Sequence, residues 1–132
     1  MQFKKALIID DDDLDVYVAK RIIENHAFAG ETASAHSVKE AMEYLESHKT
    51  KQQSPDIIFL DLNMPGQTGL DFLTKFSVFA KNNKIASTVA LLMNVVDSDD
   101  VETIAAKSHP LVNYVIEKPL TEGKLAKLKS RN

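Results

Sequence analysis

Short apolar runs alternate with longer segments of helical periodicity along this chain. The runs lie at residues 5–10, 29–34, 56–61, 87–93 and 112–116, and their length and composition predict β-strands. In the segments that follow them, apolar residues recur at the three- and four-residue intervals of amphipathic helices. Strands that alternate with helices are typical of βαβ units on a parallel sheet. The pattern therefore predicts an α/β fold with five strand–helix repeats, (βα)5.

The first two predicted helices have an apolar stripe and a polar N-cap. The stripe of the first includes Leu14 and Val18, and Asp12 or Asp13 is suited to cap its N-terminus. The second begins after a Ser37 cap and ends near residue 49. Its apolar residues have the spacing i, i+3, i+4 and i+7: Val38, Ala41, Met42 and Leu45.

The later helices follow loops rich in proline, glycine or acidic residues. Residues 64–69 form a shaped loop before the third helix, whose apolar residues are Leu70, Leu73, Phe76 and Val78. The fourth helix runs towards residue 107 and carries Val101, Ile104 and Ala105 on one face. We expect this face to be buried in the core; the alternative is a stripe that faces a partner. Thr121 opens the last helix.

Composition limits the class of protein. A chain of 132 residues with 44% hydrophobic residues fits one domain, residues 1–132, with one adequate core. The absence of cysteine excludes disulfide frameworks and cysteine-based zinc or redox sites. No apolar stretch is long enough to span a bilayer and the first residues do not resemble a signal peptide, so we expect a cytoplasmic protein without a membrane partner. The formal net charge of −3 argues against nucleic acid as a partner.

Charged side chains gather at the predicted strand ends. Asp10 ends the first strand and Asp11 follows it, Asp61 ends the third, and Lys118 lies two residues after the fifth. In open α/β sheets, ligands bind beyond the carboxyl ends of the strands. Carboxylates that crowd together there repel one another unless a cation or water intervenes. Because Mg²⁺ takes oxygen ligands, two or three carboxylates with a backbone carbonyl predict a Mg²⁺ site at this edge.

The same residues are suited to phosphoryl transfer. If a metal ion lies between the carboxylates, one oxygen of Asp61 can attack a phosphoryl group while the ion and Lys118 neutralise the transferring oxygens. Acidic residues also cap helices, and we expect only that role for Asp13 and Asp15. Four histidines fall at no metal-ligand spacing, and we expect each on the surface or in packing contacts: His26, His36, His48 and His109.

Three motifs stand out in this chain. They are Leu7-Ile8-Ile9-Asp10-Asp11-Asp12 at the end of the first strand, residues 55–66 with Gly69 in the middle, and Lys118-Pro119-Leu120-Thr121 near the end. Together they resemble the receiver domains of bacterial two-component response regulators. The middle motif is highly specific, and the resemblance runs through nearly the whole chain. It implies a flavodoxin-like, doubly wound, five-stranded parallel sheet with strand order 2-1-3-4-5.

The resemblance also implies roles for the acidic residues. Asp61 would accept the phosphoryl group. Asp10 and Asp11 would hold Mg²⁺ together with Asp61, and the backbone carbonyl of Asn63 would be a further ligand. The implied partner is a histidine kinase or a phosphotransfer protein, and the downstream protein partner is not specified.

The remaining family positions match only in part. Lys118 matches the lysine that pairs with the phosphoryl group, and the resemblance implies a cis bond between it and Pro119. Receivers usually end strand four with a threonine or serine that bonds a phosphoryl oxygen, whereas this chain has Met93, whose thioether cannot donate. Asn94 would replace it only if the strand register shifted by one residue. The aromatic switch residue expected three positions before the lysine is Val115.

Three functions are compatible with these residues. The leading hypothesis is a stand-alone receiver, without room for a DNA-binding domain, that accepts phosphate on Asp61 and acts by binding a partner or passing the phosphate on. The second is a pseudo-receiver that binds partners constitutively, because Met93 and Val115 replace the switch residues. The third is a Mg²⁺-dependent phosphatase, but that class has a second acid two residues after its nucleophile, where this chain has Asn63. We therefore expect a signalling module and not an enzyme.

Overall fold

Five parallel strands form one sheet in the order β2-β1-β3-β4-β5 in the computed structural model, which describes residues 3–64 and 66–128. The strands are β1 (Phe3–Ile9), β2 (Ala29–Ala35), β3 (Ile57–Asp61), β4 (Thr88–Met93) and β5 (Tyr114–Glu117). Every neighbouring pair is parallel, so the flavodoxin-like sheet is confirmed. Pro65, which the sequence places in the loop after β3, lies outside the described residues.

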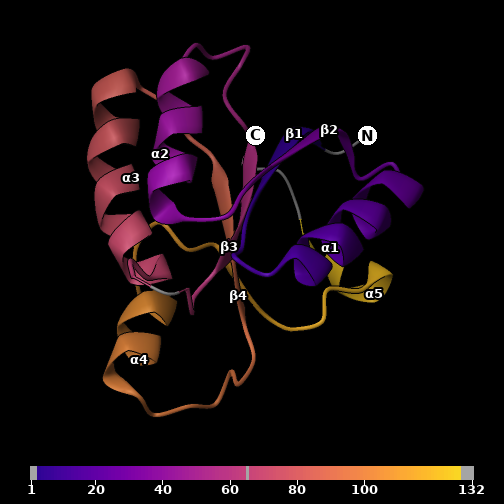
Figure 1. Ribbon diagram of the computed structural model, residues 1–132, viewed down its shortest axis with the longest axis vertical. Coiled ribbons are helices and arrows are strands. Elements are labelled where there is room, and N and C mark those ends of the chain that lie inside the picture. The colour runs from indigo at the N-terminus through magenta and orange to yellow at the C-terminus, as the bar shows by residue number, and fades with distance from the viewer. Residues whose placement is uncertain (1–2, 65, 129–132) are drawn as a thin grey trace.

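Helices cover both faces of the sheet. One face carries α1 (Asp13–Asn25) and α5 (Glu122–Leu125); the other carries α2 (Val38–Ser47), α3 (Gly69–Asn83) and α4 (Val101–Lys107), as Figure 1 shows. Alternate residues of β3 point to the two sides: Ile58 and Leu60 pack on the α2–α3–α4 side, and Ile57 and Phe59 on the α1–α5 side. Both faces are therefore apolar, as expected for a parallel sheet. No described helix has the length and apolar content needed to cross a membrane.

Where the predicted strand boundaries differ from the structure, they differ by one or two residues. β1 begins at Phe3, two residues early, because the Phe3 N–H donates to the carbonyl of Phe28 (3.1 Å). β5 begins at Tyr114, two residues late. Asn113 lies just before β5. The side-chain Oδ1 of Asn113 accepts the N–H of Val89 (2.8 Å), so a side-chain oxygen takes the place of a backbone carbonyl between β4 and this segment.

Polar caps fix the beginnings of the helices. Asp12 caps α1, and its side chain accepts the N–H groups of the first turn. The predicted caps Ser37 and Thr121 are confirmed, each accepting an N–H from three residues further on. Thr68 and Asp71 form a reciprocal capping box that starts α3.

The buried face of α1 differs from the predicted stripe. Val16, Ala19 and Ile23 are buried, whereas Leu14 is exposed. The reason is that Leu14 belongs to the first turn, where the helix borders an open pocket instead of the core. In α3, Val78 is exposed as well, and phenylalanines fill the core in its place.

The predicted burial of the apolar stripe on α4 is wrong. Val101 and Ile104 are 82% and 50% exposed, and Ala105 is exposed too. Thr103 and Ala106 are buried instead. Both sets have helical spacing, and the small side chains at 103 and 106 allow this short helix to pack closely, so the larger apolar residues face outward.

Candidate functional site

Two aspartates from neighbouring strands meet at the carboxyl edge of the sheet. β1 and β3 pair with Ile9 opposite Leu60, so the next residues, Asp10 and Asp61, lie side by side. Both carboxylates are buried, whereas Asp11 is exposed. One oxygen from each of the three aspartates lies within 4.8 Å of the others. The structure therefore brings together the carboxylates that the strand ends predicted.

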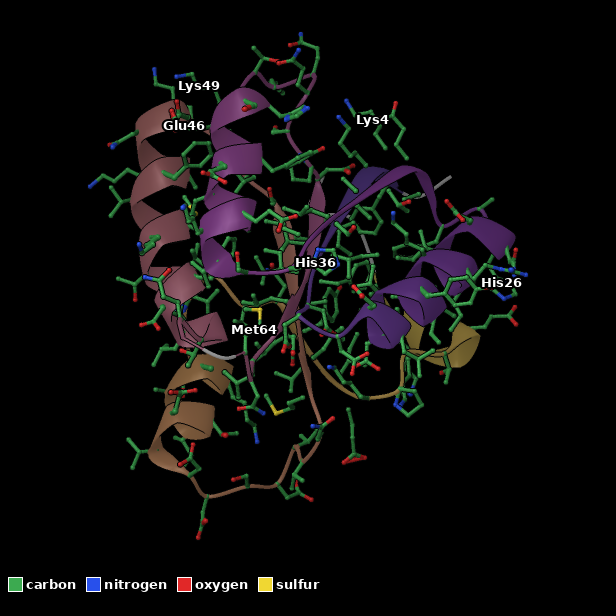
Figure 2. The ribbon with its side chains drawn as sticks, viewed as in Figure 1. Lys4, His26, His36, Glu46, Lys49 and Met64 are labelled. Carbon is green, nitrogen blue, oxygen red and sulfur yellow. The ribbon has the colours of Figure 1, made fainter. Side chains whose placement is uncertain are left out.

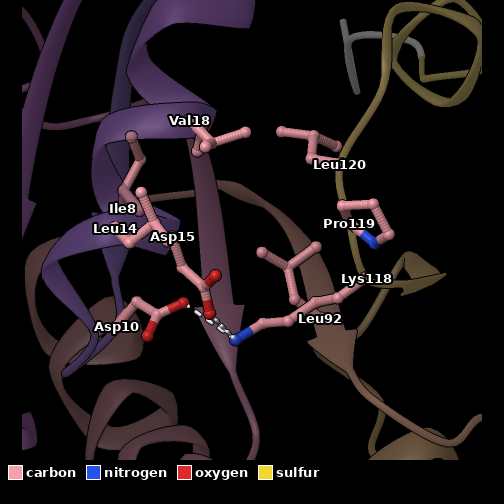
Figure 3. Close-up of a pocket in the computed structure, with 10 residues that line it drawn as sticks. Ile8, Asp10, Leu14, Asp15, Val18, Leu92, Lys118, Pro119 and Leu120 are labelled. Atoms are coloured by element: carbon pink, nitrogen blue, oxygen red, sulfur yellow. Dashed lines mark hydrogen bonds and ion pairs between the residues drawn. The ribbon is translucent and has the colours of Figure 1, made fainter.

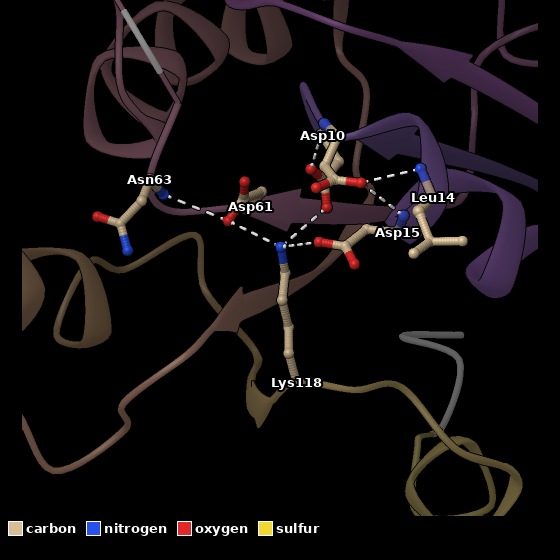
Figure 4. A network of polar contacts seen from close by, with 7 residues as sticks. Asp10, Leu14, Asp15, Asp61, Asn63 and Lys118 are labelled. Carbon is tan, nitrogen blue, oxygen red and sulfur yellow. Dashed lines mark hydrogen bonds and ion pairs between the residues drawn. The ribbon is translucent and has the colours of Figure 1, made fainter.

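Lys118 reaches the two buried carboxylates from the segment after β5. Its N–H donates to the carbonyl of Met93 (2.9 Å), and its bond to Pro119 is cis, as the resemblance implies. The Nζ atom lies 3.0 Å from Asp10 Oδ2 and 3.3 Å from Asp61 Oδ1 (Figure 4). One ammonium group therefore compensates two buried negative charges, which would be costly to leave unpaired.

Asp15 of α1 makes the shortest contact with Lys118. Its Oδ2 lies 2.8 Å from the ammonium nitrogen (Figures 3 and 4). The expectation that Asp15 only caps the helix is wrong, because Asp12 is the cap and accepts the N–H of Asp15 itself (3.1 Å). A signal was present in the sequence: Asp15 lies three and four residues before Val18 and Ala19, which places it on the sheet side of α1.

Burial and charge set the pKa values of this site. Burial and the negative charge of Asp10 raise the pKa of Asp61 from 3.8 to about 6, although Lys118 and the Asn63 N–H act in the opposite direction. Burial also acts to lower the pKa of Lys118, but its hydrogen bonds to Asp15 and Asp10 outweigh this effect and raise that pKa above its usual range. At neutral pH, Asp61 is therefore ionised and Lys118 is a cation.

One oxygen of Asp61 stays available for chemistry. The Asn63 N–H (3.3 Å) and the Lys118 ammonium group both contact Oδ1. Among the described residues, Oδ2 has no hydrogen-bond partner. The loop after β3 thus contacts Asp61 through the N–H of Asn63, which bonds the same oxygen as Lys118. The role of the Asn63 carbonyl as a metal ligand stays a prediction.

Gly69 fixes the loop after β3. From the sequence, this glycine indicated that a loop lies here but not why the position requires glycine. Its N–H donates to the carbonyl of Leu62 (2.8 Å). A Cβ atom at this position would lie 2.8 Å from Leu62 Cα and 2.9 Å from the carbonyl oxygen of Asp61. Only glycine therefore lets α3 begin so close to the end of β3.

Met93 and Val115 are the two positions at which the chain departs from the family pattern. Met93 ends β4 and is buried in the α2–α3–α4 core cluster, and Val115 packs against that cluster. Tyr114 packs on the opposite face of the sheet. Asn94 is exposed beyond the strand end, so the shifted register that would let it replace Met93 is not adopted.

An apolar pocket of about 110 Å³ adjoins the carboxylates (Figure 3). It lies between α1 and the segment after β5. Leu14, Leu92 and Leu120 line its apolar part, and Asp15 and Lys118 line its polar end. Asp10 lines the pocket as well, but its side chain is buried, whereas that of Asp15 is partly exposed.

The histidines are surface or packing residues, as predicted. His26 and His36 are exposed in different regions of the molecule (Figure 2). The ring of His48 stacks on Tyr44 with centroids 4.1 Å apart, and His109 is half-buried. No group of three metal-binding side chains within the described residues includes a histidine.

Comparison with known sequences identifies related proteins. The family model of the response regulator receiver domain matches residues 6–129. Among curated proteins, the sensory transduction protein LytT of Enterococcus faecalis is 32% identical over 76 residues. That match covers 58% of this chain and 29% of LytT, so this chain corresponds to a minor part of the relative.

Solved structures share the fold. A two-component response regulator from Cytophaga hutchinsonii has a TM-score of 0.83 and 29% identity, with 96% of this chain and 93% of that chain covered. The receiver domain of the histidine kinase CKI1 from Arabidopsis thaliana, complexed with Mg²⁺ and BeF3⁻, has a TM-score of 0.68 and 22% identity. That match covers 78% of this chain and 75% of the other, and it shows the fold alone.

Proposed function

This chain belongs to the response regulator receiver domain family, whose model matches residues 6–129, and from that premise we propose that Asp61 accepts a phosphoryl group from a histidine kinase or a phosphotransfer protein. The setting of this carboxylate carries the proposal. Asp61 is buried at a strand end, and its Oδ1 lies 3.3 Å from the Lys118 ammonium nitrogen. Its Oδ2 has no hydrogen-bond partner among the described residues. An oriented carboxylate beside a fixed cation suits nucleophilic attack on phosphorus.

The proposed cofactor is Mg²⁺, held by Asp10, Asp11 and Asp61 with the backbone carbonyl of Asn63. Octahedral Mg²⁺ ligands at about 2.1 Å lie roughly 3 to 4 Å apart. The three carboxylate oxygens, within 4.8 Å of one another, fit this geometry after small adjustments. Bound there, the ion would neutralise phosphoryl oxygens during transfer. The CKI1 receiver complexed with Mg²⁺ and BeF3⁻ supports this assignment by analogy.

In the proposed reaction, one oxygen of Asp61 forms a bond to phosphorus while the bond from phosphorus to the donor histidine nitrogen breaks. The histidine leaves with the electron pair of that bond. Lys118 donates hydrogen bonds to the negatively charged phosphoryl oxygens. The product is an aspartyl phosphate, so the chain serves as a phosphate acceptor and not as an enzyme.

The proposed output is a protein–protein interaction in the cytoplasm. The formal net charge of −3 does not favour nucleic acid. Large apolar side chains are exposed on α4 and in the loop before it: Val95, Val101 and Ile104. Such side chains are suited to contact a protein partner.

A pseudo-receiver that binds its partners constitutively is the second candidate, and Met93 favours it. The buried thioether cannot donate a hydrogen bond to a phosphoryl group, and Val115 offers no aromatic ring to respond. In this case Asp61 would have little regulated phosphorylation, and the surface of α4 would be permanently available.

Labelling with acetyl phosphate tests the proposal. We expect intact-mass spectrometry to find one added phosphate in wild type with Mg²⁺, and none in Asp61→Asn or after Mg²⁺ is chelated. Asp13→Asn removes an exposed acid from the same region and should be labelled like wild type. Labelling that persists in Asp61→Asn would contradict the proposal, and an unlabelled wild type would favour the pseudo-receiver.

A further inference from the structure

Three carboxylates surround the ammonium group of Lys118. The distances from Nζ are 2.8 Å to Asp15, 3.0 Å to Asp10 and 3.3 Å to Asp61. An ammonium group has three N–H donors and no acceptor. The contacts with Asp15 and Asp10 are hydrogen bonds, and the contact with Asp61 is an ion pair. An incoming phosphoryl oxygen therefore competes with these carboxylates for Lys118.

The three partners differ in how easily they can give way. The side chains of Asp10 and Asp61 are 2% and 6% exposed, so either would be left as a poorly solvated charge. The side chain of Asp15 is 42% exposed and lines an open pocket, so water can replace the lysine. Asp15 is also outside the group of three aspartates that could hold a metal ion. It is therefore the exchangeable partner.

We propose that Asp15 is a positioning residue that holds Lys118 in the unphosphorylated protein and competes with the phosphoryl group for it. The inference rests on the proposed function of Asp61. The Asp15 carboxylate then weakens the affinity of the site for a phosphoryl group, because part of the interaction with Lys118 must be given up on binding. The Asp15 carboxylate on α1 is thus a counter-ion that favours the unphosphorylated state over the phosphorylated state.

Two substitutions separate this role from a general effect of charge. Asp15→Asn removes the charge but keeps an oxygen that can accept the hydrogen bond from Lys118. Asp13→Asn removes a charge from the same first turn of α1, but Asp13 is 92% exposed and pairs with His36. The two variants change the net charge and the helix N-terminus in the same way, and they differ in the contact with Lys118.

The experiment is a titration with beryllofluoride, a phosphoryl analogue, at saturating Mg²⁺, followed by amide chemical shifts. We expect Asp15→Asn to bind between about twofold and fivefold more tightly than wild type, as for the loss of a partly exposed ion pair. Asp13→Asn should bind like wild type. Equal affinity of Asp15→Asn and Asp13→Asn, or weaker binding by Asp15→Asn, would overturn the proposal. A wild type that binds no beryllofluoride would overturn the proposed function itself.

A double-mutant cycle tests whether the effect acts through Lys118. In a Lys118→Gln background, Asp15→Asn should no longer tighten binding, since the competition requires the lysine. If the substitution tightens binding by the same factor in both backgrounds, Asp15 acts by direct repulsion of the anion and the proposal fails.

Discussion

At the scale of single residues, burial of Asp61 stabilises its neutral form. The carboxyl has a pKa of about 6 in the folded protein against an ordinary value of 3.8. Above pH 6, the folded protein carries a charge that its surroundings disfavour, so ionised Asp61 lowers the free energy of unfolding. One pKa unit corresponds to about 1.4 kcal/mol, so this cost reaches at most about 3 kcal/mol. The carboxylate proposed as the phosphate acceptor thus lowers the stability of the folded protein.

Without divalent cations, Asp61→Asn should therefore raise the free energy of unfolding, by up to about 3 kcal/mol above pH 6. The gain should shrink as the pH falls through about 6 towards 4, because the wild-type carboxyl is then protonated in the folded state. Urea unfolding at about pH 4.5 and about pH 8 measures both limits. The same gain at both pH values, or a loss at the higher one, would contradict the raised pKa.

The residues of the site were predictable to different degrees. Asp10 and Asp61 stand directly after apolar runs and Lys118 stands two residues after one, so the carboxyl edge of a parallel sheet brings them together whatever the details of packing. Asp15 was not predictable in this way. An acid in the first turn of a helix already has a capping role, and its contact with Lys118 depends on the rotation of α1 about its axis.

At the scale of elements, the contact between the end of β3 and the start of α3 positions Asp61, the proposed nucleophile. The Gly69 position lies against the backbone of Asp61 and Leu62, with no space for a Cβ atom. The capping box of Thr68 and Asp71 then sets the first turn of α3. Local backbone geometry thus fixes where the Asp61 carboxylate points.

Gly69→Ala should lower the free energy of unfolding by about 1–3 kcal/mol, because the new methyl group overlaps with backbone atoms that cannot move independently. Gly123→Ala is the matched control: nothing lies within 4 Å of its added Cβ, and it is in α5, so its effect should be neutral or stabilising. Chemical denaturation of both variants tests this. A Gly69→Ala protein as stable as Gly123→Ala would argue against the close packing.

Periodicity predicted which segments are helices but not always which face is buried. In α4, the stripe of Val101 and Ile104 has the same spacing as Thr103 and Ala106, and the smaller pair is the one that packs inward. In α1, the first turn borders a pocket, so Leu14 is exposed. Sequence periodicity does not predict how closely a helix packs on the sheet, and it does not predict where the sheet ends.

At the scale of the whole molecule, the proposed acceptor site and the surface of α4 are connected through β4 and β5. Met93 ends β4, and its carbonyl accepts the N–H of Lys118 (2.9 Å). A ligand shifts a two-state equilibrium only by its differential affinity for the two states. A hydrogen bond to a charged group contributes about 1.5–3 kcal/mol, and the Met93 thioether cannot supply it. Phosphorylation should therefore act only weakly on α4.

The comparison of wild type with Met93→Thr tests this separation of phosphorylation from response. With beryllofluoride and Mg²⁺, amide chemical shifts in α4 and β5 should change little in wild type and more in Met93→Thr, whose hydroxyl can bond the phosphoryl analogue. Shifts at the Asp61 loop should change in both proteins and confirm binding. A large wild-type change in α4 that the substitution leaves unaltered would contradict the weak coupling.

Localisation of the phosphate tests the central claim most directly. Borohydride reduces an acyl phosphate to an alcohol, so an aspartyl phosphate becomes homoserine and its position can be read from peptide mass spectra. After reaction with acetyl phosphate and Mg²⁺, we predict homoserine at position 61. Homoserine at position 10, 11 or 15 instead, or none in a protein that carries label, would contradict the assignment of Asp61 as the phosphate acceptor.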